Sequence, residues 1–310
     1  MIMNKKSFLF TTIAIALSIV IILSYRVYTS PKLDNEMKTI ETRTETLNNF
    51  IKGAEGDIYQ AIYIISYRSL LSIEDYMMAN DDFINNLGTN LNNAFGESFI
   101  SGTINSQKMA LMENNTFLNW TGKIKDEANK TGISIDFTIN SVSITQSSPW
   151  MVDVSVDLTI NAKDTHKTAS WAISRVFTGQ INITGFVDPL YLVNNDGKVN
   201  NSINKTIVSD FGTGLPTHPL KSYYVEHSDA PSYLMRFENN LGASPFGIES
   251  LVNSQKIMDA GLAAKDRSAV DYIYFGTGST TNCDIINFEA YEWFKLDNNH
   301  LSFYEATCSS

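Results

Sequence analysis

The chain has 310 residues, a formal net charge of −10 and an isoelectric point near 4.9. Nucleic-acid binding requires basic patches that displace counterions, so this acidic balance excludes nucleic acid as a partner. Hydrophobic residues make up 43% of the sequence, which is enough for one or two packed cores and excludes a disordered stalk.

The first predicted element is an uncharged apolar run over residues 8–25, directly after Lys5 and Lys6. A helix of this length rises about 27 Å, roughly the hydrocarbon thickness of a bilayer. Because the lysines precede the run and no acid occurs before Asp34, the positive-inside rule leaves residues 1–7 in the cytoplasm, as a stub or leader. We therefore expect a single-pass cell-membrane protein that contacts the lipid bilayer through residues 8–25, with the bulk of the chain extracellular. A soluble core helix and a cleaved secretory signal are the alternatives.

The second predicted element is a helical stem over residues 31–80, with a break or kink at Pro31. Apolar residues recur along the stem in steps of three and four, which gives one apolar stripe with charged residues on the other faces. Such a stripe needs a partner, either the chain's own sheet or another copy of the chain. The residues of this predicted assembly face are Leu33, Met37, Ile40, Leu47, Ile51, Ile58 and Ile65.

Residues 81–222 are expected to form an ectodomain that begins with short helices and loops, including a helix over 117–130. Its clearest feature is an antiparallel meander over residues 133–184, where three segments alternate apolar and polar residues. This alternation is typical of strands with one buried and one solvated face. In the third strand the apolar series begins at Trp171. The stem helix can cover the dry face, so the sequence predicts the α+β class.

The remaining part, residues 223–310, is expected to be a loop-rich α/β subdomain, with a helix over 251–264 and strands over 270–275 and 285–294. It contains the two cysteines of the chain, Cys283 and Cys308. In an exported domain such a pair is most simply a disulfide that closes a terminal loop. Two free buried thiols are the alternative.

Six N-x-S/T sequons follow the apolar run, and none precedes it. In an exported chain each sequon is a candidate glycosylation site, which would lie on the surface of a glycoprotein. Their asparagines are Asn114, Asn119, Asn129, Asn182, Asn200 and Asn204.

The sequence contains no recognisable catalytic or metal-binding motif. The four histidines, His166, His218, His227 and His300, form no HExxH pattern and are expected to be loop or surface residues. No G-x-S-x-G elbow occurs, and the cysteines lack the CxxC spacing of a metal site. We therefore expect no metal, no cofactor and no enzymatic activity.

The start of the chain resembles a class III signal peptide of the type IV pilins. The basic pair Lys5–Lys6 is followed by the small residue Ser7, and the apolar run begins at once with Phe8. The resemblance implies cleavage between Ser7 and Phe8, retention of the helix and assembly with copies of itself or with other pilin-like subunits. Pilins carry glutamate at the fifth mature position, whereas this chain has Thr12. Some minor, tip-located pilin-like subunits also lack that glutamate.

The resemblance covers the first eighty or so residues and the cysteine pair, which is similar to the disulfide-closed terminal loop of pilins. Together with the anchor, it leads us to expect an extracellular structural or adhesion protein, a minor pilin-like subunit of a surface filament. The alternative is a monomeric, signal-anchored ectodomain that binds a ligand or an envelope partner.

Overall fold

The structure is a computed structural model that describes residues 5–208, 210–286, 291 and 293–309; of these, the side chains of residues 5–13 and 26–34 are not described. The chain divides into two compact units. Unit 1 consists of Met1–Glu55, Lys125–Asp136 and Ile160–Ile173. Unit 2 consists of Gly56–Ile124, Phe137–Thr159 and Ser174–Ser310. Helices and sheets both occur, so the predicted α+β class is confirmed.

The first helix, α1, runs without interruption from Lys5 to Asn80. The helix expected over residues 31–80 is therefore confirmed, but the break expected at Pro31 is wrong. A proline removes one backbone donor and crowds the preceding turn, but the other backbone hydrogen bonds of a long helix remain, so the helix can continue past it.

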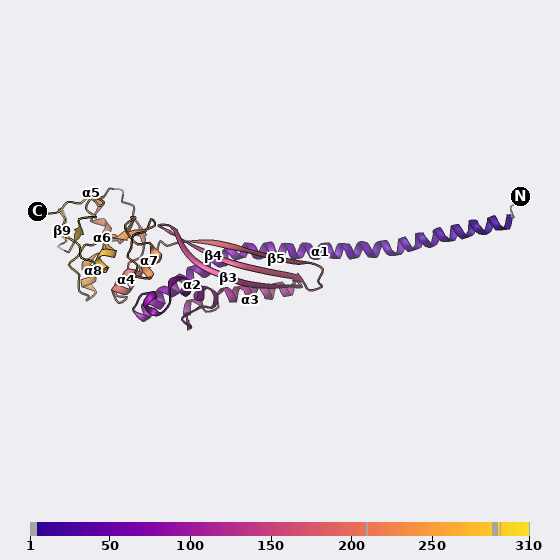
Figure 1. The fold of residues 1–310 in the computed structure, drawn as a ribbon, viewed down its shortest axis with the longest axis horizontal. Coiled ribbons are helices and arrows are strands. Elements are labelled where there is room, and N and C mark those ends of the chain that lie inside the picture. The colour runs from indigo at the N-terminus through magenta and orange to yellow at the C-terminus, as the bar shows by residue number, and fades with distance from the viewer. Residues whose placement is uncertain (1–4, 209, 287–290, 292, 310) are drawn as a thin grey trace. The chain divides into compact units, whose positions relative to one another are not determined.

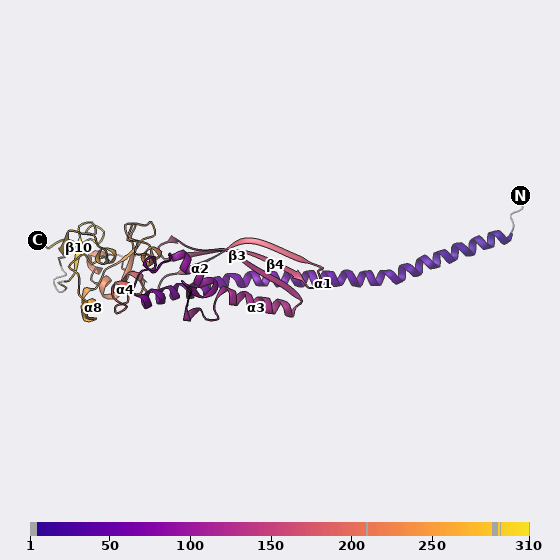
Figure 2. The ribbon, with the colours of Figure 1, turned by 60° about the horizontal axis from the view of Figure 1, so that its bottom comes forward.

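A three-stranded sheet follows, with the order β3-β4-β5. Short turns join consecutive strands, as in the predicted antiparallel meander. Figure 1 and Figure 2 both show the three strands running side by side. The strands are β3 (Ile133–Ser148), β4 (Met151–Asp164) and β5 (Ser170–Asn182).

The central strand β4 confirms the predicted alternation. Its inward side chains, Val152, Val154, Val156, Leu158 and Ile160, are all at most 1% exposed. In β5 the side chain of Trp171 is 43% exposed, so the inward series does not begin at that residue as expected. Burial in β5 starts at Phe177, whose ring meets the ring of Tyr59 from α1 at 5.6 Å between centroids.

In unit 2, α1 packs closely against β5 at Gly179. A Cβ at this position would lie 3.0 Å from the side chain of Ile62 on α1. Glycine therefore lets the helix pack directly on the strand, and the apolar side chains of the strand close the core on either side of this contact.

The segment between α1 and the sheet contains short elements that end in α3, which has the predicted bounds Phe117–Lys130. The preceding elements are η1 (Ile84–Leu87), α2 (Leu91–Ser101), β1 (Thr103–Ile104), β2 (Gln107–Lys108) and η2 (Ala110–Met112).

After the meander, short helices and strands surround a second three-stranded sheet with the order β6-β7-β8. Strand β6 pairs with β7 in parallel, with Asn204 opposite Tyr223, so this sheet crosses the boundary expected at residues 222 and 223. The elements are α4 (Pro189–Asn194), β6 (Asn204–Lys205), α5 (Phe211–Gly214), α6 (Thr217–Lys221), β7 (Tyr223–Glu226), α7 (Tyr233–Phe237), β8 (Ile248–Ser250), α8 (Ser254–Asp259), α9 (Asp271–Phe275), β9 (Asn282–Asp284) and β10 (Lys295–Asp297).

Three element predictions in this region need correction. Residues 271–275 form helix α9 where a strand was expected, because a short apolar run fits either element. The helix expected over 251–264 is limited to α8, residues 254–259. Strand pairing occurs in β9 and β10, on either side of the strand expected over 285–294; of that range, residues 287–290 and 292 lie outside the described residues.

Cys283 and Cys308 form a disulfide with a Cα–Cα distance of 5.6 Å, which confirms the predicted pairing. The bond joins β9 to the end of the chain, where Ser309 also donates its backbone N–H to the carbonyl of Asp284.

We expect the double substitution Cys283→Ser with Cys308→Ser to lower the free energy of unfolding by about 3 kcal/mol, because the crosslink restricts the unfolded chain over a loop of this size. Urea unfolding of the oxidised protein and of the variant measures the difference. Reductant should bring the wild type to the stability of the variant and leave the variant unchanged. Equal stability of the oxidised wild type and the variant would contradict this expectation.

Candidate functional site

The predicted processing site, Lys5, Lys6, Ser7 and Phe8, has no described side chains. The side chains of residues 8–13, at the start of the expected membrane span, are not described either. Among the helices and side chains that the structure does describe, none forms a stretch long and apolar enough to cross a membrane.

The described part of the apolar run is a helix with exposed hydrophobic side chains on all sides. Seven large apolar residues of α1 are between 51% and 62% exposed in the isolated chain. They are Ile15, Leu17, Ile19, Val20, Ile21, Ile22 and Leu23. Their spacing covers the whole circumference of a helix, so no single partner face within the chain would bury them.

The predicted assembly face on α1 divides into two parts. The side chains of Leu47, Ile51, Ile58 and Ile65 are at most 4% exposed, so the chain itself already covers them and they are not available to a partner. The predicted stripe is therefore not one continuous face that another subunit could contact. Met37 and Ile40 are 67% and 47% exposed, and the side chain of Leu33 lies outside the described residues.

All six sequon asparagines have exposed side chains. They lie on helix α3, in loops and in strands β5 and β6. Glycosylation at Asn114, Asn119, Asn129, Asn182, Asn200 and Asn204 remains a prediction.

Unit 2 contains a charged group that is completely buried, the guanidinium of Arg236 on α7. Its Nη1 donates to Asp188 Oδ2 at 2.6 Å and to Asp271 Oδ2 at 2.9 Å, and both carboxylates are also fully buried. Tyr224 donates to the same oxygen of Asp188, and Ser250 donates its backbone N–H and hydroxyl to Asp271. This network joins four elements and leaves each carboxylate with several donors.

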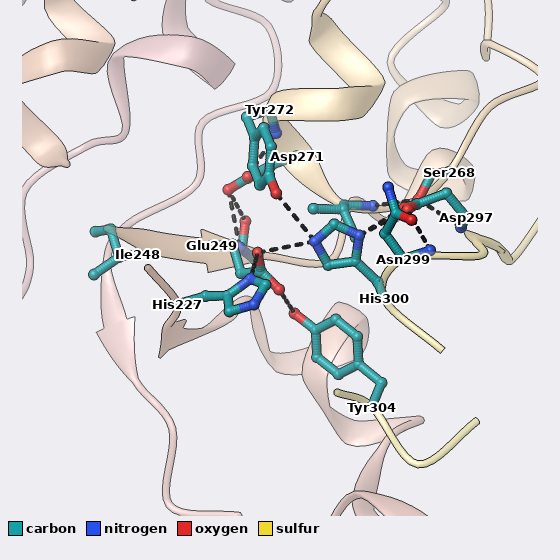
Figure 3. A network of polar contacts seen from close by, with 12 residues as sticks. His227, Ile248, Glu249, Ser268, Asp271, Tyr272, Asp297, Asn299, His300 and Tyr304 are labelled. Carbon is teal, nitrogen blue, oxygen red and sulfur yellow. Dashed lines mark hydrogen bonds and ion pairs between the residues drawn. The ribbon is translucent and has the colours of Figure 1, made fainter. Parts of the chain in front are cut away.

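Next to this network, His227, Glu249 and His300 bring one potential ligand atom each to within 4.8 Å of one another. His227 Nδ1 lies 2.7 Å from Glu249 Oε2, and His300 Nε2 lies 3.4 Å from the same oxygen. Figure 3 shows the three side chains pointing toward one another. We call these residues the His–Glu–His cluster.

The cluster is supported by a second ring of polar contacts (Figure 3). His300 Nδ1 donates to Asp297 at 2.8 Å, and Ser268 donates its hydroxyl to the same carboxylate. Tyr304 donates to Glu249 Oε1 at 2.6 Å. Tyr272 has its hydroxyl 3.0 Å from His300 Nε2. The ring of His300 and the carboxylate of Glu249 are therefore each held by residues outside the cluster.

Short elements position the three side chains. Glu249 is the middle residue of β8 and lies opposite Val225 of β7, and His227 follows directly after β7. His227 donates its backbone N–H to Gly247, where a Cβ would overlap the carbonyl oxygens of His227 and Ala230. The absence of a side chain at Gly247 thus permits the tight return that holds His227 against Glu249.

Charge is concentrated in this cluster. Burial alone would lower the pKa of His300, but its contacts with Asp297 and Glu249 outweigh burial and raise the pKa to about 10. Burial alone would raise the pKa of Glu249, but hydrogen bonds with His227 and His300 hold it below its ordinary value. Without a bound ion, the cluster thus contains an imidazolium between two carboxylates.

The expectation that the four histidines are loop or surface residues is wrong for His218 on α6, whereas His300 is a loop residue, in the turn after β10, with a buried side chain. The side chains of His218 and His300 are buried, that of His227 is 15% exposed, and that of His166 lies at the surface. Their positions in the sequence gave no warning, because His227, Glu249 and His300 are separated by long intervals. The only local signal is the acid at Asp297, three residues before His300.

No protein-family model, no curated protein and no solved structure matches the chain.

Proposed function

We propose that the chain is a membrane-anchored structural or adhesion protein of the cell surface, with pilin-like architecture. Residues 8–25 insert into the lipid bilayer, residues 1–7 are the cytoplasmic stub or leader, and the bulk of the chain lies outside the cell. In this proposal α1 is both the anchor and the support on which the sheet β3-β4-β5 is folded.

The observation that carries the proposal is the contrast along α1. Between Ile15 and Leu23 the large apolar side chains are more than half exposed, whereas Ile58, Ile62 and Ile73 are completely buried. Exposing contiguous apolar surface to water is unfavourable, so the first stretch requires apolar surroundings that the chain does not supply. A bilayer, or the helices of other subunits after assembly, would supply them.

The pilin-like part of the proposal has two further supports. One helix continues from the apolar stretch into the folded units, and a disulfide closes the C-terminal loop. Met37 and Ile40, exposed on the same helix, offer an apolar contact beyond the bilayer for a neighbouring subunit. A structural subunit of this kind requires no catalytic residue.

The test is the intact mass and N-terminal residue of the protein extracted from its native membrane. We expect release from the membrane by detergent but not by salt or alkali, and a mature chain that begins at Phe8. A detergent-extracted chain that begins at Met1 would reject the pilin-like processing and favour the monomeric, signal-anchored ectodomain. Release by salt alone would reject the membrane anchor itself.

A further inference from the structure

We propose that the His–Glu–His cluster is a zinc site, in which His227 Nδ1, Glu249 Oε2 and His300 Nε2 coordinate one Zn²⁺ ion. Two imidazoles and one carboxylate are a ligand set that holds Zn²⁺ with a further position open to water. This inference is independent of the membrane anchor and of subunit assembly, because all of the residues lie in unit 2.

Two of the three separations between ligand atoms are close to those of a formed site, and the third, between the two histidines, is at most 4.8 Å. Ligand bonds of about 2.0 to 2.1 Å at tetrahedral angles separate two ligand atoms by about 3.3 Å. His300 Nε2 and Glu249 Oε2 are already 3.4 Å apart. His227 Nδ1 is at 2.7 Å from the same oxygen and must move away by a few tenths of an ångström. The side chain of His227 is 15% exposed, against 4% for His300 and 0% for Glu249, so it is the least enclosed of the three ligands.

The second ring of contacts orients the ligands as a metal site requires. Asp297 accepts the Nδ1 proton of His300, which leaves Nε2 as the atom that faces the centre. Metal-bound histidines commonly donate their other nitrogen to a carboxylate in this way, which fixes the tautomer and makes the ligand more basic. Tyr304 occupies Glu249 Oε1 and leaves Oε2 for the ion. Phe303 stacks on the His227 ring at 4.2 Å between centroids and restricts its orientation.

The charge of the cluster also matches a divalent cation. With both imidazoles neutral, the Glu249 and Asp297 carboxylates contribute two negative charges, which one Zn²⁺ balances. Tyr272 places a hydroxyl beside His300 Nε2, where it can hydrogen-bond the water in the open position. Imidazole nitrogen favours zinc over magnesium or calcium, which prefer oxygen ligands alone.

The experiment uses the full chain, purified in detergent without a polyhistidine tag and treated with a chelator. Titration calorimetry with ZnCl₂ should give one ion per chain. Substitution of the outermost ligand, His227→Gln, should weaken binding at least tenfold, and Asp297→Asn should weaken it about 10- to 100-fold through the loss of ligand orientation. His166→Gln, which removes an exposed histidine from unit 1, is the matched control and should bind as the wild type does.

Binding of Co²⁺ reports the ligand geometry in the same samples. The wild type and the His166→Gln control should give the visible absorption of four-coordinate Co²⁺, and the His227→Gln variant should lose it. Failure of the folded wild type to bind one Zn²⁺ per chain would overturn the proposal, whatever the variants do. Equal loss of affinity in His166→Gln and His227→Gln would also overturn it, because binding would then be a property of surface histidines.

Discussion

The free energy of unfolding is expected to fall by about 3 to 5 kcal/mol when Arg236 is replaced by methionine. Methionine fills part of the same volume but leaves Asp188 and Asp271 without their shared cation in a site closed to water. The cost arises mainly from these two buried carboxylates, which lie at 2.6 and 2.9 Å from Arg236 Nη1 in the wild type. Urea unfolding followed by tryptophan fluorescence measures the loss.

Two comparisons separate this effect from a simple loss of positive charge. Lys221→Met removes an exposed cation from the same unit and should change the stability by less than about 0.5 kcal/mol. Combining Arg236→Met with Asp271→Asn should be less damaging than the sum of the two single substitutions, because the second removes one of the stranded charges. Strict additivity would show that the ion pairs are not the source of the loss.

The second large effect is a pH dependence that arises from Glu74 on α1. This side chain is 6% exposed and accepts a hydrogen bond from Tyr233 at 2.9 Å. Burial, together with the neighbouring Asp75 and Asp188, raises the pKa of Glu74 to about 8 from an ordinary value of 4.5. The folded protein therefore keeps a proton on Glu74 over a pH range in which the unfolded chain has lost it.

The sign of the effect follows from this difference in bound protons. Below pH 4.5 the carboxyl is protonated in both states and costs nothing. As the pH rises toward 8 the folded state binds more protons than the unfolded state, so the stability declines by up to about 1.4 kcal/mol per pH unit. Over the whole interval the decline amounts to about 5 kcal/mol, and it levels off at higher pH.

Glu74→Gln should remove this decline, so that the difference in unfolding free energy between the wild type and the variant changes steadily between pH 5 and pH 8. The exposed carboxyl of Asp57 on the same helix provides the control, since Asp57→Asn should leave the slope as it is. A constant difference between Glu74→Gln and the wild type across this range would mean that Glu74 is ionised in the folded state.

The sequence was most informative where local pattern and tertiary burial agree. The alternation from Val152 to Ile160 predicts a strand because every second side chain enters the core, and these side chains are indeed buried. Helix α3 could be placed to its ends because the chain leaves it at Gly132, whose φ of 74° suits glycine. Prediction failed for residues 271–275, which form a short helix whose first residue, Asp271, pairs with Arg236, 35 residues away.

The buried polar sites could not be predicted from the sequence for the same reason. His227, Glu249 and His300 meet only because β7 pairs with β8 and the turn after β10 returns beside them. The residues on either side of each histidine in the sequence are typical of a surface loop. Glu74 and Tyr233 are 159 positions apart, and nothing near either residue indicates the hydrogen bond that joins them.

The disulfide has a consequence for the order of events during maturation. Cys283 and Cys308 close the segment that carries Asp297 and His300, and in β10 Leu296 lies opposite Cys283. In a reducing compartment this segment lacks its crosslink, and ordering His300 against Glu249 costs more chain entropy. With the proposed extracellular location, the disulfide would form after export, and the proposed zinc site, which depends on this segment, would be completed outside the cytoplasm.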